Sequence, residues 1–580
     1  MGITFPAKNT NTGIESKWFF SRQDFDNSLR SHRAGDLHPS YLSLGDDFED
    51  WHKATAHLTS DIYPQLLDDF REIFVTSGSG AISHRQAEVL VGGLANSIAQ
   101  RIARATKQVQ LLGDSHSVDD LQINRFDLLT LRTPKSTEDS YSLLASEEIG
   151  SLIETLAVRR HFELPSSVRL ISENSYDHLE SDENEATKPL VTRVYLNVQK
   201  RLSARSSKNS ISIVASYLGR GKEILLSLVL GQTPLLLEVR PPLKTTNHVS
   251  SRGSLILESE STRATSLFLM KVLTPWSLIE GFGETLERAY SLGFPRNPSV
   301  IFTTNSFDTD DEFKVHLAEA LPSATYVVGQ HGNNYGISKT TEICSEQYAS
   351  DLFLSWGWGG EEYGVHPFGQ IKPALKGKFP SNVKGVTLFL RTQYGFVSQA
   401  DTHEIDRHYF MRIEQLCASL NDLQITTHLR LHTSSSLFTK NLLEKAIEKM
   451  PFISISGDRP SMRKLLASGM GIVFGYDSTG MLEMGTAGIP FFFFAPDGLG
   501  LVRQEYQANY DSLRSAGLLS EDPDQASQLI STWISASRVE RKTQREAIQN
   551  FTKGIAHSPK KKLRALRKIL KNADGNVAQV

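Results

Sequence analysis

Apolar residues recur at intervals of three and four along the first part of the chain. The pattern is clear in DIYPQLLDDFREIF (61–74) and AEVLVGGLANSIAQRIARAT (87–106). Because this spacing places side chains on one face of an α-helix, it predicts amphipathic helices. We therefore expect a helical N-terminal region over residues 1–135.

Beyond this region, short runs rich in β-branched and aromatic residues alternate with helical segments. In 136–375 the strand-like runs are SISIVASYL (210–218), TPLLLEV (233–239), SVIFTTNSF (299–307) and ATYVVGQHG (324–332). In 376–537 they are GVTLFLRT (385–392), QITTHLRLH (424–432), FISISG (452–457), GIVFGYDS (471–478) and PFFFFAP (490–496). Such alternation predicts a parallel sheet covered by helices. Two runs of it, joined by a Gly/Pro-rich stretch (364–380), predict an α/β fold with two facing Rossmann-type domains.

Two segments depart from this pattern. The acidic stretch 172–189 carries few apolar residues, so we expect a surface loop. Residues 538–580 form a strongly basic tail, in which KKKLRALRKILK places apolar side chains on one helical face: Leu563, Leu566, Ile569 and Leu570. This pattern suits contact with an anionic membrane surface. The alternative is a solvated C-terminal helix packed on the protein.

Composition narrows the class of protein. A chain of 580 residues is too long for one core, and a net charge of −3 argues against a nucleic-acid partner. Two cysteines without a CxxC pair indicate neither a disulfide scaffold nor a cysteine zinc site. We find no signal region, and no apolar run approaches the roughly 18 residues of a spanning helix. We expect a cytoplasmic protein, able to lie peripherally on the inner face of the cytoplasmic membrane.

The segment 327–360 carries the first candidate site. His331 follows a predicted strand and lies between glycines, where a general base or a phosphate donor is useful; the alternative is a structural His capping the loop. Carboxylates that could serve instead are Glu346, Asp310 and Asp311. Trp356 and Trp358 could stack on a sugar or belong to the core. The remaining loop candidates for the acceptor side are Gln330, Gly332, Asn333, Asn334, Tyr335 and Asp351.

The segment 471–496 carries the second candidate site. Asp477, Ser478 and Thr479 open a predicted helix, and exposed N–H groups at such a start can bind a nucleotide phosphate. Glu483 could reach a ribose hydroxyl. The alternative is an ordinary capped helix with an acid in its first turn.

Three cations end other strands of this region: Arg391, Arg430 and His432. They could hold a pyrophosphate or a base. The P-loop, HExxH and GxSxG motifs are absent, and YLGRGKE (217–223) lacks the third glycine of a dinucleotide fingerprint. We therefore expect no bound cofactor and no metal.

The block TTNSFDTDDEFKVHLAEALPSATYVVGQHGNNYGISKTTEICSEQYASDLFLSWGWG resembles the central motif block of a family of transferases from bacterial O-antigen and surface-carbohydrate regions. The block from Asp477 through Ser478 and Glu483 to Pro490 is also similar to that family. The resemblance implies a GT-B-like fold and a CMP-activated donor of a sialic-acid-like (nonulosonic) sugar. A shorter likeness to CDP-glycerol-type phosphotransferases, which carry an HG loop and a DYSS-like block, implies that the HG histidine acts as base.

These observations lead to the hypothesis of a glycosyltransferase. In this hypothesis the donor is a CMP-activated nonulosonic or Kdo-like acid and lies on the second domain. A surface-polysaccharide or lipid-linked glycan acceptor would enter from the first domain. Three alternatives stay open: a CDP-alditol-type phosphotransferase, a nucleotide-sugar epimerase, and a non-catalytic membrane-associated scaffold.

Overall fold

The structure of the chain is a computed structural model. It describes residues 6–7, 16–17, 48–113, 128–144, 147–161, 168–173, 205–206, 208–234, 255–257, 261–339, 343–360, 364–391, 406–432, 437–457 and 459–577. The predicted surface loop over 172–189 and the strand predicted over 233–239 lie outside the described residues beyond positions 173 and 234.

The predicted N-terminal helices are present as α2 (Phe48–Thr76) and α3 (His84–Gly113). Their apolar stripes face inward: Leu66, Leu67 and Phe70 on α2 are fully buried. The two helices share one hydrophobic core with the first sheet of the chain. The helical region expected over 1–135 therefore packs as part of the first α/β domain, because its apolar stripe is completed by strands far along the sequence.

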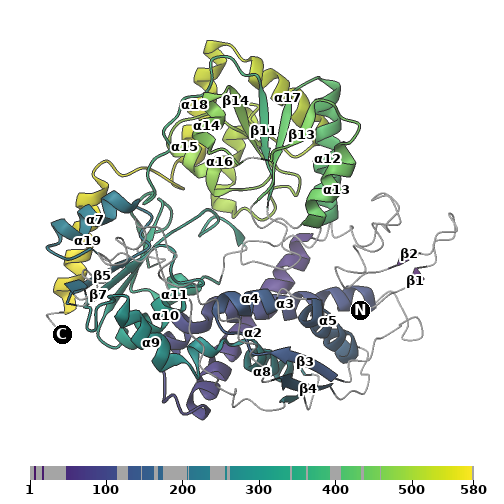
Figure 1. Cartoon of the computed structure of the whole chain (residues 1–580). Helices are drawn as coiled ribbons and strands as arrows, with labels where there is room; N and C mark the ends of the chain where they lie inside the picture. Colours follow the sequence, from purple (N-terminus) through teal and green to yellow (C-terminus); the bar gives the residue numbers. More distant parts are fainter. Residues whose placement is uncertain are drawn as a thin grey trace, which may run out of the picture.

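The first sheet has five parallel strands in the order β10-β9-β8-β7-β5 (Figure 1). Their bounds are β5 (Ile211–Val214), β7 (Val300–Thr303), β8 (Thr325–Gly329), β9 (Leu352–Ser355) and β10 (Val365–Pro367). Strands β5 and β7 are buried at every position, as expected for a parallel sheet covered on both faces. Because the strands are parallel, the loops that follow them gather at one edge of the sheet.

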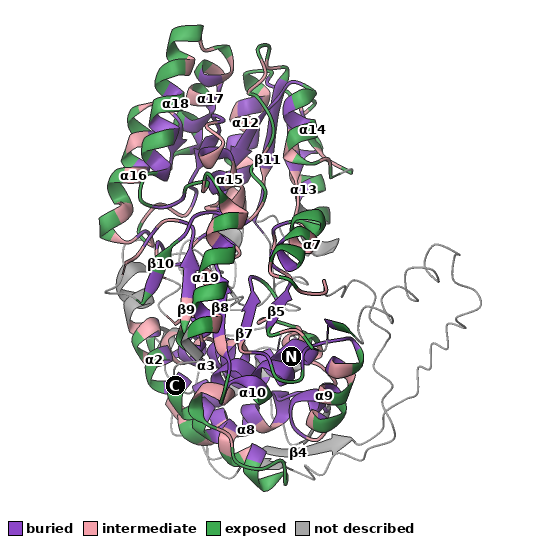
Figure 2. Cartoon of the chain, turned by 90° about the vertical axis from the view of Figure 1, so that its left-hand side faces the viewer, coloured by how far each residue is buried: buried purple, intermediate pink, exposed green. Residues whose placement is uncertain are grey.

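Different helices cover the two faces of this sheet. On one face lie α3, α10 (Asp311–Ala320) and the short α11 (Ser345–Ala349). On the other lie α7 (Arg220–Val229) and α19 (Lys562–Val577), and Figure 2 shows α19 crossing in front of β7 and β8.

The basic tail is therefore not a free amphipathic helix. Its first helix, α18 (Arg538–Thr552), packs on the second domain, and α19 returns to the first domain. Leu566 and Leu570 are fully buried in one cluster with Ile213 and Phe302 of the first sheet. The apolar face that suggested membrane contact is thus occupied by the sheet, as in the packed-helix alternative.

Smaller elements complete the first domain. They are the pair β1 (Pro6–Ala7) and β2 (Ser16–Lys17), the sheet β3 (Leu128–Arg132), β4 (Val168–Glu173) and β6 (Leu255–Leu257), and helices α4 (Thr137–Leu144), α5 (Glu147–His161), α8 (Thr262–Leu273), η5 (Trp276–Leu278) and α9 (Phe282–Ser291).

The second sheet has six parallel strands in the order β13-β12-β11-β14-β15-β16. Their bounds are β11 (Gly385–Phe389), β12 (Thr427–Arg430), β13 (Ile453–Ile455), β14 (Met470–Phe474), β15 (Phe492–Phe494) and β16 (Leu519–Ser520). The helices are α12 (Asp406–Asp422), α13 (Leu437–Ile447), α14 (Met462–Ala467), α15 (Thr479–Thr486), α16 (Gln504–Ser515) and α17 (Pro523–Ser535). The strand order is that of a Rossmann domain and reverses between β11 and β14, where such folds bind ligands.

The α/β architecture with two Rossmann-type domains is thus confirmed, and each predicted run that is described contains a strand. In these two sheets, strands β9, β10 and β16 were not predicted, and β10 lies in the stretch interpreted as a linker. The domains are joined twice: by the segment between β10 and β11, and by the segment between α18 and α19 (Figure 1). Within the described part of the chain, no helix combines the length and the apolar character needed to span a bilayer.

Candidate functional site

The loop after β8 meets the loop after β14 at the junction of the two domains. The backbone N–H of Asn333 donates to Thr479 Oγ1 at 3.1 Å, and Asn333 Nδ2 donates to Asp477 Oδ1 at 2.6 Å. A Cβ at Gly332 would lie 3.1 Å from the same hydroxyl, which explains the glycine. The structure therefore brings the two candidate segments together, and Asn333 and Asp477 hold the domains to each other.

His331 belongs to a hydrogen-bonded chain that leads away from this junction. Its Nδ1 lies 2.9 Å from Tyr335 Oη, which donates to Glu346 Oε1 at 3.0 Å. Since the single phenolic proton goes to the carboxylate, the imidazole must donate from Nδ1. The lone pair is then left on Nε2. Asn334, at φ 75°, makes the turn that returns Tyr335 beneath the imidazole.

The surroundings keep His331 neutral. Burial, with a smaller contribution from Lys372, lowers its pKa to about 4, although the charge of Asp308 opposes the shift. The aromatic rings of Tyr217 and Phe307 lie 6.4 and 5.6 Å from the imidazole, measured between ring centroids. A neutral imidazole with a free Nε2 can accept a proton at pH 7.

Glu346 lies at the far end of this hydrogen-bonded chain and accepts the hydrogen bond donated by Tyr335. It is 5% exposed and receives hydrogen bonds from Tyr335, Cys344 Sγ (3.3 Å) and Ser345 Oγ (3.5 Å). Burial raises the pKa of its carboxyl. Because Glu346 is enclosed by protein, its geometry suits holding Tyr335 in place, and the catalytic role expected from the sequence stays a prediction.

A second buried acid lies behind Glu346 and was missed by the sequence analysis. Glu88 of α3 accepts a hydrogen bond from the Tyr63 hydroxyl of α2. Burial, with a smaller contribution from the charge of Glu346, raises its pKa to about 7, although the hydrogen bond from Tyr63 opposes the shift. The available signal was an acid on the apolar stripe AEVLVGG.

Lys372 and Tyr217 were also missed. Lys372 Nζ lies 4.8 Å from the centroid of the Tyr217 ring and 3.3 Å from Glu483 Oε1. It therefore joins both domains near His331, although it belongs to a stretch interpreted as a linker. Tyr217 has φ 56°, an uncommon conformation for a non-glycine residue that often accompanies function, and its hydroxyl donates to Asn305 Oδ1 at 2.8 Å. Glu483, expected near a ribose, is paired with Lys372.

Ser478 caps α15, as predicted. Its hydroxyl accepts from the N–H of Gly480 at 3.0 Å, so both hydroxyls of the pair Ser478–Thr479 already have protein partners. Asp477 also accepts from the hydroxyl of Tyr510, and burial raises its pKa to about 6. The N–H groups of Gly480 and Met481 also have protein partners, the hydroxyl and the carbonyl of Ser478. The feature of this helix start that favours an anion is therefore the positive end of the α15 dipole.

Cations gather at the neighbouring strand ends of the second sheet. The Arg430 guanidinium lies 4.6 Å from the centroid of the Phe389 ring, and Arg459 donates to the carbonyl of His432 at 3.3 Å. Burial lowers the pKa of His432, and Arg459 and Arg430 lower it further. The predicted pair Arg430 and His432 is thus together, with Arg459 added, close to the point where the strand order reverses.

Arg391 lies on β11's carboxyl side, deeper in the protein. It is 4% exposed, its Nη1 lies 3.5 Å from Asp497 Oδ2, and its guanidinium stacks 4.2 Å from the Tyr409 ring centroid. Arg391 is therefore a buried cation paired with Asp497 at the end of β11.

Three predicted carboxylates are structural. Asp310 caps α10 by accepting from the N–H of Phe313 at 3.0 Å. Asp311 is buried and accepts from the backbone and hydroxyl of Thr137 and from the hydroxyl of Ser277. Asp351 precedes β9 at the opposite edge of the sheet from His331, where it bonds Tyr326 N at 2.8 Å and Arg85 at 2.6 Å. None of the three contacts the His331 chain.

Gln330 and both tryptophans belong to the core. Trp356 and Trp358 are 0% and 5% exposed. Trp358 Nε1 donates to Gln330 Oε1 at 2.7 Å, and Trp356 Nε1 donates to the Gln330 carbonyl at 2.8 Å. Gln330 Nε2 in turn donates to Gly332 O at 2.6 Å. These bonds fix the backbone of the His331 loop, so a sugar-stacking role is wrong for both indoles.

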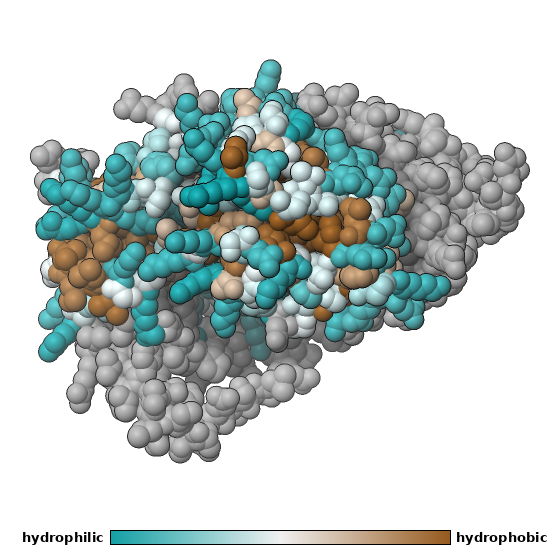
Figure 3. All heavy atoms as spheres, turned by 90° about the horizontal axis from the view of Figure 1, so that it is seen from above, coloured by the Kyte–Doolittle hydropathy of each residue, from teal (hydrophilic) through white to brown (hydrophobic). Residues whose placement is uncertain are grey.

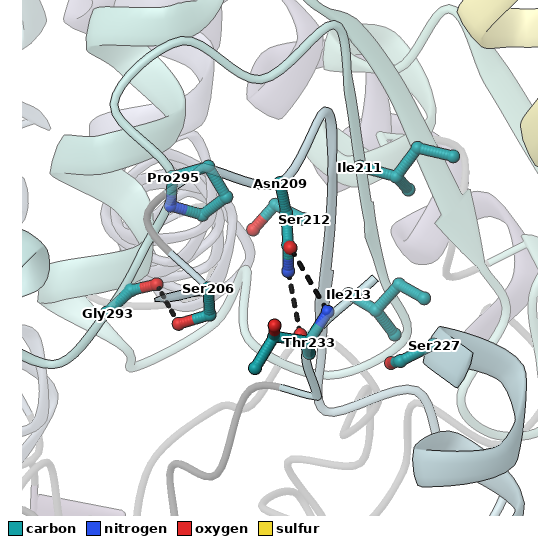
Figure 4. A pocket seen from close by; sticks show the side chains of 9 residues that line it. All are labelled: Ser206, Asn209, Ile211, Ser212, Ile213, Ser227, Thr233, Gly293 and Pro295. Atoms are coloured by element: carbon teal, nitrogen blue, oxygen red, sulfur yellow. Dashed lines mark hydrogen bonds between the residues drawn. The ribbon is translucent and has the colours of Figure 1, made fainter. Parts of the chain in front are cut away.

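A small cavity lies elsewhere in the first domain (Figure 4). Its volume is about 10 Å³, and its lining includes Ser206, Asn209 and Thr233. That is room for one water at most, so it is no nucleotide site. No group of His, Cys, Asp and Glu suited to a metal ion occurs among the described residues. The expectation of a reaction without metal or cofactor stays a prediction.

Comparison with known proteins identifies a family. A family model described as "LIC12162 family transferase" matches residues 12–566. No curated protein matches the chain.

Solved structures share limited similarity with the chain. A UDP co-structure of MnaA from S. aureus is 11% identical, covers 62% of this chain and 94% of its own, and has a TM-score of 0.36. An O-GlcNAc transferase from Thermobaculum terrenum is 11% identical, covers 91% and 98%, and has a TM-score of 0.31. Os79 from O. sativa in complex with UDP is 11% identical, covers 52% and 81%, and has a TM-score of 0.33. At such TM-scores we base neither fold nor function on these likenesses.

Proposed function

Because the chain belongs to the LIC12162 family of transferases, we propose that it is a glycosyltransferase that uses a nucleotide-activated sugar. The acceptor is a hydroxyl of a surface-polysaccharide or lipid-linked glycan. One observation carries the proposal: the chain His331–Tyr335–Glu346 places a neutral imidazole with a free Nε2 beside the start of α15. A base and an anion-binding helix start on opposing domains suit transfer from a phosphate leaving group to a hydroxyl.

The donor binds on the second domain in this proposal. The strand order reverses there, and the helix start at Ser478 offers the positive end of the α15 dipole to a phosphate. Arg430 and Arg459 add positive charge at the neighbouring strand end, beside His432, whose pKa they lower. The resemblance to O-antigen-region transferases supports CMP as the nucleotide, with a nonulosonic or Kdo-like acid as the sugar.

The reaction follows from the orientation of His331. The acceptor hydroxyl transfers its proton to Nε2 while its oxygen bonds to the anomeric carbon. The bond between that carbon and the donor phosphate oxygen breaks at the same time, and the nucleotide departs as an anion. Tyr335 and Glu346 hold the imidazolium through Nδ1–H. The α15 dipole and Lys372 can stabilise the departing phosphate.

The first test is a thermal-shift screen against CMP, CDP, UDP and GDP. A nucleotide at a hundredfold excess over its dissociation constant stabilises the folded state by about 2.7 kcal/mol. We expect a shift with CMP. A shift with CDP alone would favour the CDP-alditol-type phosphotransferase, and no shift with any nucleotide would contradict the donor site.

The second test separates catalysis from binding. His331→Ala should bind the stabilising nucleotide normally and lose about 100-fold or more in transfer rate, the usual contribution of a general base. His366→Ala, which changes an exposed histidine on β10, is the matched control. Full transfer by His331→Ala would overturn the role of the base. Normal polymer production in cells carrying that variant would favour the non-catalytic scaffold.

A further inference from the structure

Helix α7 turns a row of large apolar side chains toward water. Leu225, Leu228 and Val229 are 47%, 58% and 42% exposed, whereas Leu226 of the same helix is buried. Spacings of three and four residues place the three on one face. Single exposed leucines need no explanation, but three on one helical face form a continuous apolar strip.

Cations border this strip. Helix α19 lies beside α7, and Arg567 Nε donates to the Val229 carbonyl at 3.0 Å. The chain has no acidic residue between positions 546 and 574. The exposed cations of residues 560–571 and of α7 are Arg220, Lys222, Lys560, Lys561, Arg564, Arg567, Lys568 and Lys571.

The two helices present their exposed sides in a common direction. Both face the viewer in Figure 2, and Figure 1 places them together on the left of the first domain. Seen from above in Figure 3, that end of the molecule shows apolar surface bordered by hydrophilic side chains.

We propose that this α7–α19 face docks on the surface of an anionic lipid bilayer. Leucines that enter the interface and cations that meet lipid headgroups are the two components of peripheral membrane binding. A nucleic acid or an acidic protein would use the cations alone and would leave the side chains of Leu225, Leu228 and Val229 in water. The docking element is α7 assisted by the cationic side of α19, since the apolar side of α19 is buried in the first sheet.

The surface lies one short segment away from His331. Tyr217, whose ring is 6.4 Å from the imidazole, precedes the first residue of α7 by three positions. Docking through α7 therefore holds the acceptor side of the junction near the headgroups. Resting on the proposed function, this placement favours a lipid-linked acceptor over a free glycan.

Flotation of the full-length chain with vesicles tests the proposal. We expect binding to vesicles of equal parts phosphatidylcholine and phosphatidylglycerol, little binding to pure phosphatidylcholine, and weakening by salt. The variant Leu225→Ser/Leu228→Ser should bind anionic vesicles about tenfold or more weakly. The matched control Val75→Ser/Val539→Ser changes side chains that are 51% and 77% exposed elsewhere and should bind normally.

Charge reversal gives an independent measurement. Lys568→Glu/Lys571→Glu should weaken vesicle binding by about fivefold for each cation removed, whereas Lys445→Glu/Lys449→Glu on the second domain should not. Melting temperatures of all variants should match that of the parent chain.

Three results would contradict the proposed docking surface. The first is no binding to anionic vesicles, and the second is an equal loss of vesicle binding in the leucine variant and in its valine control. The third is tighter binding to duplex DNA than to vesicles, with DNA binding unchanged in the leucine variant. These readouts need no transfer activity. Loss of vesicle binding with nucleotide stabilisation retained would therefore reject the docking surface and leave the proposed function standing.

Discussion

At the scale of single residues, the chemistry depends on which nitrogen of His331 carries its proton. Tyr335 has one proton to give and gives it to Glu346, so the imidazole donates from Nδ1. Three residues from one loop and the following helix thus define a base whose free nitrogen is Nε2. Two predictions follow from this arrangement.

The first concerns pH. The base must be unprotonated to act, and burial lowers the pKa of His331 to about 4. Activity should therefore persist as pH falls through 6.5, the ordinary range of histidine, and decline only near pH 4. The acid limb of kcat/KM, followed by nucleotide release from the donor, measures this. An acid limb at pH 6 to 7 would contradict the buried, neutral imidazole.

The second concerns the tautomer. Tyr335→Phe removes the acceptor of the Nδ1 proton and frees the imidazole to place that proton on Nε2. We expect kcat to fall about 10- to 100-fold with little change in KM, part of the contribution of a general base. The ¹⁵N shifts of His331 should move from the Nδ1–H to the Nε2–H pattern, a change that loss of packing alone would not produce. Tyr348→Phe, an exposed tyrosine on α11, is the control.

At the scale of elements, the helices α2, α3 and α11 converge on a buried acidic centre. Gly92 of α3 has no room for a side chain, because a Cβ there would lie 2.8 Å from Ser345 Cβ and 3.0 Å from Glu88 Oε1. This close approach lets the N-terminal helices support the element that carries Glu346. As a consequence, a second carboxyl group, that of Glu88, is buried away from water.

Burial of the Glu88 carboxyl predicts that the free energy of unfolding depends on pH. The pKa of Glu88 is raised to about 7 in the folded state from an ordinary 4.5. The folded state holds this proton more tightly, so the extra stability is present below pH 4.5 and is lost as pH rises through about 7. Above that pH the buried carboxylate is charged. Glu88→Gln should therefore raise the free energy of unfolding at pH 8 by roughly 1–3 kcal/mol.

Urea unfolding at pH 5 and pH 8 checks this prediction. The gain of Glu88→Gln should shrink at pH 5, and Glu72→Gln, an exposed acid on α2, should change neither value. A Glu88→Gln chain that is less stable at pH 8 would show that the Tyr63–Glu88 hydrogen bond outweighs desolvation of the carboxylate.

At the scale of the whole molecule, the chain crosses between its domains and returns. Helix α18 packs on the second domain, and α19 closes the open face of the first sheet. The C-terminal helix therefore stabilises the domain that carries His331, although the two are more than 200 positions apart.

Leu566→Ala tests this coupling. The side chain is 0% exposed, so the substitution should lower the free energy of unfolding by about 2–5 kcal/mol. Lys568→Ala, exposed on the same helix, should stay within about 0.5 kcal/mol. Chemical denaturation of both variants measures the difference. Equal stability of Leu566→Ala and the parent chain would show that α19 adds little to the first domain.

The sequence by itself determined the elements and their order. Runs such as ISIV and MGIVF are strands, and Ser478 caps a helix, because these features depend on neighbours along the chain. The same reasoning found His331 and Ser478 at strand ends, which parallel sheets gather at one edge.

Only the tertiary structure decided the partners of buried polar groups and apolar faces. The sequence offered Asp311 as a candidate catalytic acid, but its carboxylate accepts a hydrogen bond from Thr137, which is distant in sequence. The apolar face of α19 suggested a membrane-binding surface, but the first sheet covers it. Periodicity shows that a face is apolar and composition shows that an acid is present. Neither carries information about which distant element completes the contact, because that choice is made by packing in three dimensions.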